Sequence, residues 1–155
     1  MVRAFRHPGV GACVVVAMLH VSGCALMPKS AKGDSFAKVA VPPGKAVVYF
    51  FRPDRFAMSA NTIFMSIPHE ANIACPMVTA GYHIYVGEPG TLTVSYAEGG
   101  LTPVVKKFTL ELKDGDERYI KIDFGKWGPV VEYEEIPADK ALPIIAQYRM
   151  IGKCE

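Results

Sequence analysis

The sequence predicts an all-β fold, an antiparallel β-sandwich of the Ig-like or prealbumin-like kind with about seven short strands. Two observations favour this class. Apolar and polar residues alternate with a period of two through much of residues 42–136, and turn signals rich in Gly and Pro separate these runs. No long run with helical periodicity interrupts them. Such a pattern is typical of antiparallel sheets that each keep one solvated face.

The first predicted strand, residues 46–51 ("AVVYFF"), is apolar at every position. Its β-branched and aromatic side chains favour a central strand that is covered on both faces. Pro53 follows closely and predicts the end of the strand, because proline has no N–H to donate to a neighbouring strand.

Clear alternation predicts strands around residues 91–97, 108–112 and 119–124. Asp114 and Gly115 lie between the last two and predict a hairpin, since glycine accepts the positive φ of tight primed turns. Further strands are predicted at residues 61–67, 82–87 and 129–136, with turns at 89–90 and 98–100.

The C-terminal residues 138–152 leave two structures open. Asp139 is a candidate cap for a short helical turn, which Pro143 would keep short. Residues 147–151 are a candidate final edge strand.

The first 23 residues have the three-part organisation of a secretory signal. A basic start precedes an apolar run of about 13 residues, which is too short to cross a bilayer core of roughly 30 Å as a helix. The small pair Ser22 and Gly23 then stands directly before Cys24.

The tetrad from Val21 to Cys24 resembles the lipobox of bacterial lipoproteins. The resemblance implies cleavage before Cys24 and acylation of its sulfur and its new amino group by chains such as palmitate. Several chains anchor stably, whereas one alone is marginal. Ala25, where an Asp would imply inner-membrane retention, implies the outer membrane, facing the periplasm. The alternative is an ordinary secretory leader with Cys24 there by chance.

These features predict three parts: a lipoprotein signal peptide (1–23), a lipidated flexible tether (24–41) and a β-sandwich domain (42–155). The tether is predicted from its Lys, Ser, Gly and Ala content and its lack of periodicity. The chain has 17 basic and 15 acidic residues, and Arg3 and Arg6 leave with the leader, so the mature chain is near neutral. A nucleic-acid partner normally requires a basic face, and none is apparent, so no nucleic-acid partner is predicted.

The remaining cysteines, Cys75 and Cys154, are predicted to form a disulfide in this oxidising compartment. Closing so long a loop would contribute roughly 4–5 kcal/mol in the loop-entropy account. Two free thiols are one alternative. The other is Cys75 as a metal ligand beside His69 and His83, although their spacing matches no recognised metal pattern. No metal or cofactor is therefore predicted.

Three stretches carry a family resemblance: "KAVVYFFRPDRF" (45–56), "GYHIYVGEPGTLTVS" (81–95) and "LKDGDERYIKIDF" (112–124). With the lipobox, they resemble the bacterial lipoprotein family of domain of unknown function 2846, over roughly residues 42–151. The family commonly has "YVYR" where this chain has "YFFR" at 49–52. The resemblance implies a fold and an envelope location, and it implies no catalytic residues.

No catalytic residue is predicted, because the sequence lacks G-x-S-x-G, Walker and Rossmann patterns. Arg52, with Asp54 and Arg55, follows the most apolar strand. This cluster is predicted to be either a salt-bridged strand end or a pair of guanidinium groups, from Arg52 and Arg55, that bind an anionic partner group.

Tyr82, His83 and Tyr85 form the second candidate binding site, an aromatic surface for a glycan or a protein. The alternative for His83 is an ordinary strand histidine. The chain is thus expected to be a non-enzymatic envelope lipoprotein with a structural or protein-interaction role. A small-ligand or peptidoglycan-binding module is the second hypothesis, and an envelope hydrolase is the third.

Overall fold

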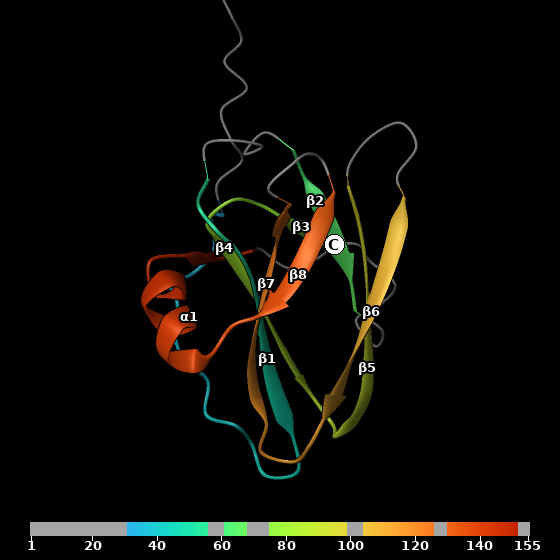
Figure 1. The fold of residues 1–155 in the computed structure, drawn as a ribbon. Helices are drawn as coiled ribbons and strands as arrows, with labels where there is room; N and C mark the ends of the chain where they lie inside the picture. Colours follow the sequence, from blue (N-terminus) through green and yellow to red (C-terminus); the bar gives the residue numbers. More distant parts are fainter. Residues whose placement is uncertain (1–30, 56–60, 68–74, 99–103, 126–129, 152–155) are drawn as a thin grey trace, which may run out of the picture.

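The computed structural model describes residues 31–55, 61–67, 75–98, 104–125 and 130–151. They form two facing sheets with one short helix, which confirms the predicted β-sandwich (Figure 1). The elements are β1 (Ala46–Arg52), β2 (Ile63–Ser66), β3 (Cys75–Met77), β4 (Gly81–Gly87), β5 (Gly90–Glu98), β6 (Val105–Leu112), β7 (Glu117–Phe124), β8 (Val131–Glu135), α1 (Ala138–Ile145) and β9 (Arg149–Met150).

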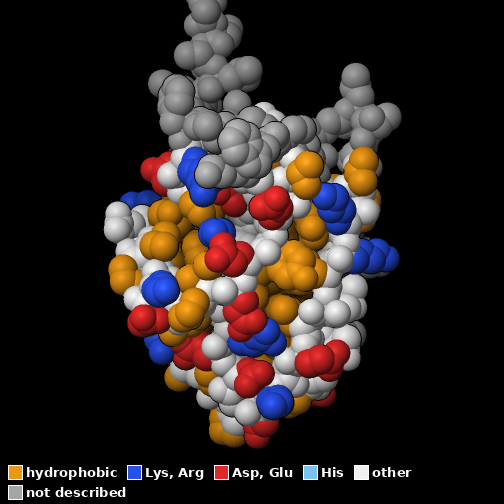
Figure 2. Space-filling model, in the orientation of Figure 1, with side chains coloured by type: hydrophobic (Ala, Val, Ile, Leu, Met, Phe, Trp, Pro, Cys, Tyr) orange, Lys and Arg blue, Asp and Glu red, His pale blue; other side chains and the backbone are white. Residues whose placement is uncertain are grey.

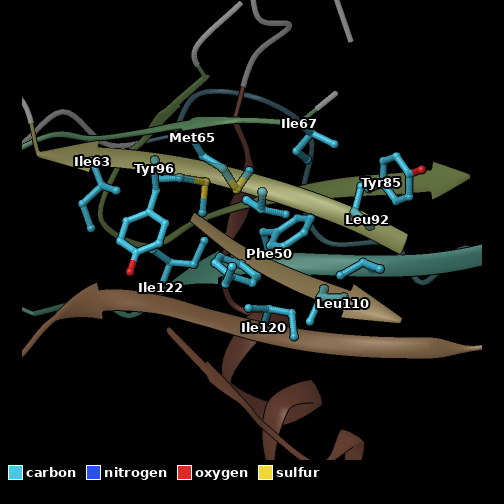
Figure 3. Close-up of a cluster of buried hydrophobic side chains, with 14 of the residues drawn as sticks. Phe50, Ile63, Met65, Ile67, Tyr85, Leu92, Tyr96, Leu110, Ile120 and Ile122 are labelled. Carbon is cyan, nitrogen blue, oxygen red and sulfur yellow. The ribbon is translucent and has the colours of Figure 1, made fainter. Parts of the chain in front are cut away.

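The five-stranded sheet has the order β8-β7-β1-β4-β9, and the four-stranded sheet has the order β3-β2-β5-β6. Every residue of β1 is buried, as expected for a central strand. In β5 and β6 the alternate apolar residues are buried between the sheets, as the period of two predicts. Figure 3 shows this main core, to which both sheets contribute side chains: Phe50, Ile63, Met65, Ile67, Tyr85, Leu92, Tyr96, Leu110, Ile120 and Ile122.

The sheets are not antiparallel throughout. β1 pairs antiparallel with β4 but parallel with β7, and β9 pairs parallel with β4. β6 and β7 lie in different sheets, and the turn between them lies beside the start of β1, so β7 and β1 begin at the same end and run in the same direction. Alternation shows which side chains share a face of a strand but does not show which strand pairs with it. The parallel pairings could therefore not be derived from the sequence.

The turn between β6 and β7 forms as predicted, but the predicted hairpin is wrong. The backbone N–H of Asp116 donates to the carbonyl of Lys113 at 3.1 Å, and Gly115 has a φ of +81°. The two strands leave this turn into opposite sheets. The N–H of Gly115 donates instead to the carbonyl of Lys45 at 2.9 Å, which fixes the turn beside the start of β1.

The predicted tether is also wrong over residues 31–41, which pack on the five-stranded sheet. We call these residues the N-terminal segment. Phe36 and Val41 contact a second apolar cluster on the outer face of this sheet, beneath α1. The N–H of Gly33 donates to the carbonyl of Met150 at 3.0 Å, and a side chain at Gly33 would collide with that oxygen. Within this segment Ala31 is buried and Gly33, Phe36, Val39 and Val41 are half-buried. These positions follow no regular period, so periodicity did not reveal the packing.

The C-terminal expectations are largely confirmed. A short helix, α1, forms with Pro143 inside it, and the chain returns as β9. Asp139 lies in the first turn rather than at the cap, which is Pro137. The carboxylate still lies at the helix end that favours negative charge.

Candidate functional site

The strand-end cluster predicted around Arg52 turns inward. Arg52 is only 2% exposed, and its Nη1 donates to the carbonyl of Asn61 at 2.6 Å and to that of Met77 at 3.0 Å. Its guanidinium carbon lies 5.1 Å from the ring centroid of Phe124, a cation–π distance. Burial lowers the pKa of Arg52, and the negative charge of Asp123 opposes that change. Arg52 thus joins the end of β1 to that of β3, across the two sheets.

Arg55 is the exposed member of the cluster. Its side chain is 53% exposed, and its Nε lies 3.0 Å from Oδ2 of the buried Asp123. Asp54 is held separately, because its backbone N–H donates to the hydroxyl of Tyr148 at 3.0 Å. The salt-bridged strand end is therefore the interpretation that the contacts support. The predicted anion grip is wrong for Arg52, whose guanidinium bonds to carbonyls inside the protein.

A hollow of about 430 Å³ lies beside Arg55, over β7 and β8. Its lining carries cations and carboxylates together, and Lys121 forms an ion pair with Glu134 of the neighbouring strand. Figure 2 shows blue and red side chains interspersed over the visible face. The lining of this hollow therefore mixes both signs, with two cations and three carboxylates.

A second hollow, of about 470 Å³, lies at the connection between β4 and β5. Lys45 and Glu88 form an ion pair across it, with 3.0 Å between Nζ and Oε1. The hydrogen bond from Lys45 lowers the pKa of Glu88. Neither hollow brings together a nucleophile, a base and an oxyanion donor from its lining residues, the arrangement that acyl transfer needs.

The predicted aromatic surface does not exist as one face. Tyr82 and Tyr85 point to opposite sides of β4, and both are buried, with exposures of 0% and 8%. Tyr82 packs in the second apolar cluster beneath α1, which we call the outer cluster. Its hydroxyl donates to the carbonyl of Ser35 at 3.2 Å. Tyr85 packs in the main core, and the half-buried His83 shares its side of the strand. The N-terminal segment, predicted as a tether, covers the ring of Tyr82, with the ring centroids of Phe36 and Tyr82 5.3 Å apart.

The cysteine predictions lie at the boundary of what the structure describes. Cys75 is disulfide-bonded, but Cys24, His69 and the predicted partner Cys154 fall outside the described residues, so the pairing stays a prediction. Within the described ranges, no three His, Cys, Asp or Glu side chains gather as a metal site would require. No metal site involving Cys75 is assigned.

The outer cluster also carries polar groups that were not predicted from the sequence. The ring of Tyr49 stacks on that of Tyr119, with centroids 4.9 Å apart, and Phe36 lies 5.6 Å from Tyr49. The hydroxyl of Tyr119 donates to Glu117, and Lys38 forms an ion pair with the same carboxylate at 2.9 Å. In the sequence, the aromatic Phe36 among small and charged residues was the available indication that this segment packs on the sheet.

This cluster predicts alkaline sensitivity. Burial raises the pKa of Tyr49, Tyr82 and Tyr119 above the ordinary value of 10.0. Below pH 10 these hydroxyls are neutral both folded and unfolded. Above it the unfolded chain ionises first, so the folded state binds more protons and loses stability as the pH rises. We expect chemical denaturation midpoints to be level from pH 8 to about 10 and then to fall.

Absorbance of tyrosinate at 295 nm provides the second measurement for this prediction. We expect a fraction of the tyrosines to ionise only together with unfolding. Tyr119→Phe should reduce the slope of stability against pH above 10. A slope that is equally steep in this variant would contradict the assignment of the effect to Tyr119.

Among the described residues, no helix is long and apolar enough to cross a bilayer. No family model matches the chain, and neither do any curated protein or solved structure.

Proposed function

We propose that the chain is a lipoprotein of the bacterial envelope, anchored through acylated Cys24 in the outer membrane and facing the periplasm, with a non-enzymatic structural or protein-interaction role. The lipobox that ends at Cys24 carries this proposal. Small residues before a cysteine give a signal peptidase access, and the thiol is the group that accepts the diacylglycerol.

The position of the N-terminal segment supports a domain held close to its anchor. Ala31 is already 8% exposed in the main core, so only residues 25–30 separate Cys24 from the folded part. Fully extended, the chain from Cys24 to Ala31 spans at most about 25 Å. The domain would therefore remain within one molecular diameter of the bilayer.

The contacts of the candidate residues support a structural role for these side chains. Arg52 bonds to carbonyls, Lys121 and Arg55 pair with carboxylates, and the aromatic rings of β4 are buried. The second hypothesis, a glycan-binding module, had Tyr82 and Tyr85 as its platform, and their burial removes that support.

The test compares the native chain with Cys24→Ser, using Cys13→Ser in the leader as the matched control. We expect intact mass to show cleavage before Cys24 and added acyl chains in the native protein and in Cys13→Ser. Cys24→Ser should lose both the acyl mass and sedimentation with membranes. Equal membrane association of all three proteins would contradict the anchoring.

Crosslinking in intact cells tests the role. An envelope protein captured by native chain and Cys13→Ser, but not by Cys24→Ser, would support a membrane-localised interaction. Hydrolysis of an envelope substrate by the purified protein would contradict the non-enzymatic role.

A further inference from the structure

The outer face of the four-stranded sheet carries an apolar band at one end. Phe64 of β2 lies opposite Pro76 of β3 and Ala97 of β5, and Ala97 lies opposite Val105 of β6. These four residues, which we call the apolar band, cross all four strands in one row. Phe64 is 38% exposed and Val105 is 60% exposed, so among the described residues the band faces outward.

The same face becomes polar with distance from the band. The next outward-facing row holds Ser66, Ser95 and Lys107, and the row after it pairs Thr93 with Thr109. In the last row, Thr91 donates to Glu111 at 2.9 Å. The apolar side chains are therefore confined to one end, followed by a cation, then hydroxyls, and finally a carboxylate.

The apolar band lies at the end of the sandwich from which the chain continues toward Cys24. Arg52 at the end of β1 pairs with Gly81, which pairs with Arg149 of β9. Gly33 bonds to the adjacent Met150. Arg52 also bonds to the carbonyl of Met77, the neighbour of Pro76. This chain of contacts brings the band and the start of the folded chain to the same end, which is the upper end in Figure 1.

We propose that the apolar band rests in the interfacial region of the bilayer, so that the acylated protein lies with this end on the membrane. The inference rests on the proposed acylation of Cys24. The short link between Cys24 and Ala31 keeps this end of the domain near the headgroups. Exposed aromatic and aliphatic side chains gain from burial at the headgroup boundary, and Lys107, one row below, can keep its ammonium among anionic headgroups.

The experiment uses full-length acylated protein reconstituted in vesicles of phosphatidylethanolamine and phosphatidylglycerol. A polarity-sensitive fluorophore is attached at Val105→Cys in the band. Val86→Cys is the matched control, because Val86 is also exposed, at 45%, but lies at the opposite end of the sandwich. Thr109→Cys controls for distance along the same strand face.

We expect the emission of the label at position 105 to shift to the blue on reconstitution, and brominated lipid to quench it several-fold more strongly than the label at position 86. The label at position 109 should behave as in water. Ala97→Cys, in the same row, supplies an independent position if Val105→Cys disturbs the fold.

Three results would overturn the inference. Water-like emission at positions 105 and 97 in protein of acylated mass would remove the membrane contact while leaving the anchor in place. A blue shift without quenching by brominated lipid would mean that a second copy or another protein covers the band. A mature mass without acyl chains would contradict the proposed anchoring and, with it, this orientation.

Discussion

Arg52→Met is expected to lower the free energy of unfolding by about 3–5 kcal/mol, the cost of removing one partner from a buried polar network. The variant keeps the long apolar stem but loses the bonds to the carbonyls of Asn61 and Met77, and both acceptors are left near or in the interior. It also removes the positive charge beside the buried Asp123. A buried acceptor or carboxylate without its partner retains its full desolvation cost.

Urea denaturation followed by circular dichroism measures this effect, and Arg55→Met is the matched control. Arg55 pairs with the same carboxylate from an exposed position. Its loss takes one partner from Asp123 but leaves both carbonyl bonds of Arg52 in place, so we expect a smaller loss of stability than for Arg52→Met. If the two variants were equally stable, the bonds of Arg52 between the ends of β1 and β3 would not be an important link between the two sheets.

The sequence was a sufficient guide to most strands and to the faces they bury. The unbroken apolar run in β1 and the alternation in β5 and β6 depend only on local spacing, and burial follows that spacing residue by residue. Gly115 likewise revealed its positive φ, because the conformational preference of glycine is local.

Which strands become neighbours is a property of distant segments, and this part could not be predicted. The turn at Asp114 and Gly115 suits a hairpin, yet the chain uses it to pass from one sheet to the other. β7 then aligns parallel to β1, some seventy residues earlier. Local turn chemistry is the same in both arrangements, so only packing between the sheets distinguishes them.

The predictions that Arg52 and Tyr82 lie at a binding surface were wrong for the same reason. Arg52 was expected to emerge at a strand end, but β3 lies beside that end and supplies a carbonyl for it. Tyr82 was expected at a surface, but the N-terminal segment crosses over it. In each case the side chain is covered by a segment that has no clear periodicity. The sequence around Arg52 or Tyr82 does not indicate that such a segment packs against it.

Tyr49→Ala is the second large effect, with an expected loss of about 3–5 kcal/mol of stability, as for other buried aromatic side chains truncated to alanine. Tyr49 is fully buried and stacks on Tyr119. Its hydroxyl accepts the N–H of Val39 at 2.8 Å and donates to the carbonyl of the same residue at 3.3 Å. The variant therefore removes the ring beneath the N-terminal segment and the bonds that hold the segment.

Tyr49→Phe separates these two contributions, because it keeps the ring and removes only the hydroxyl. It should cost about 1 kcal/mol, the net worth of a hydrogen bond, and hydrogen exchange at the amide of Val39 should accelerate. If Tyr49→Ala cost little more than Tyr49→Phe, the outer cluster would not be a second core. Residues 31–41 would then be the flexible spacer that their composition predicts, and the band on the four-stranded sheet would no longer be held within reach of the membrane.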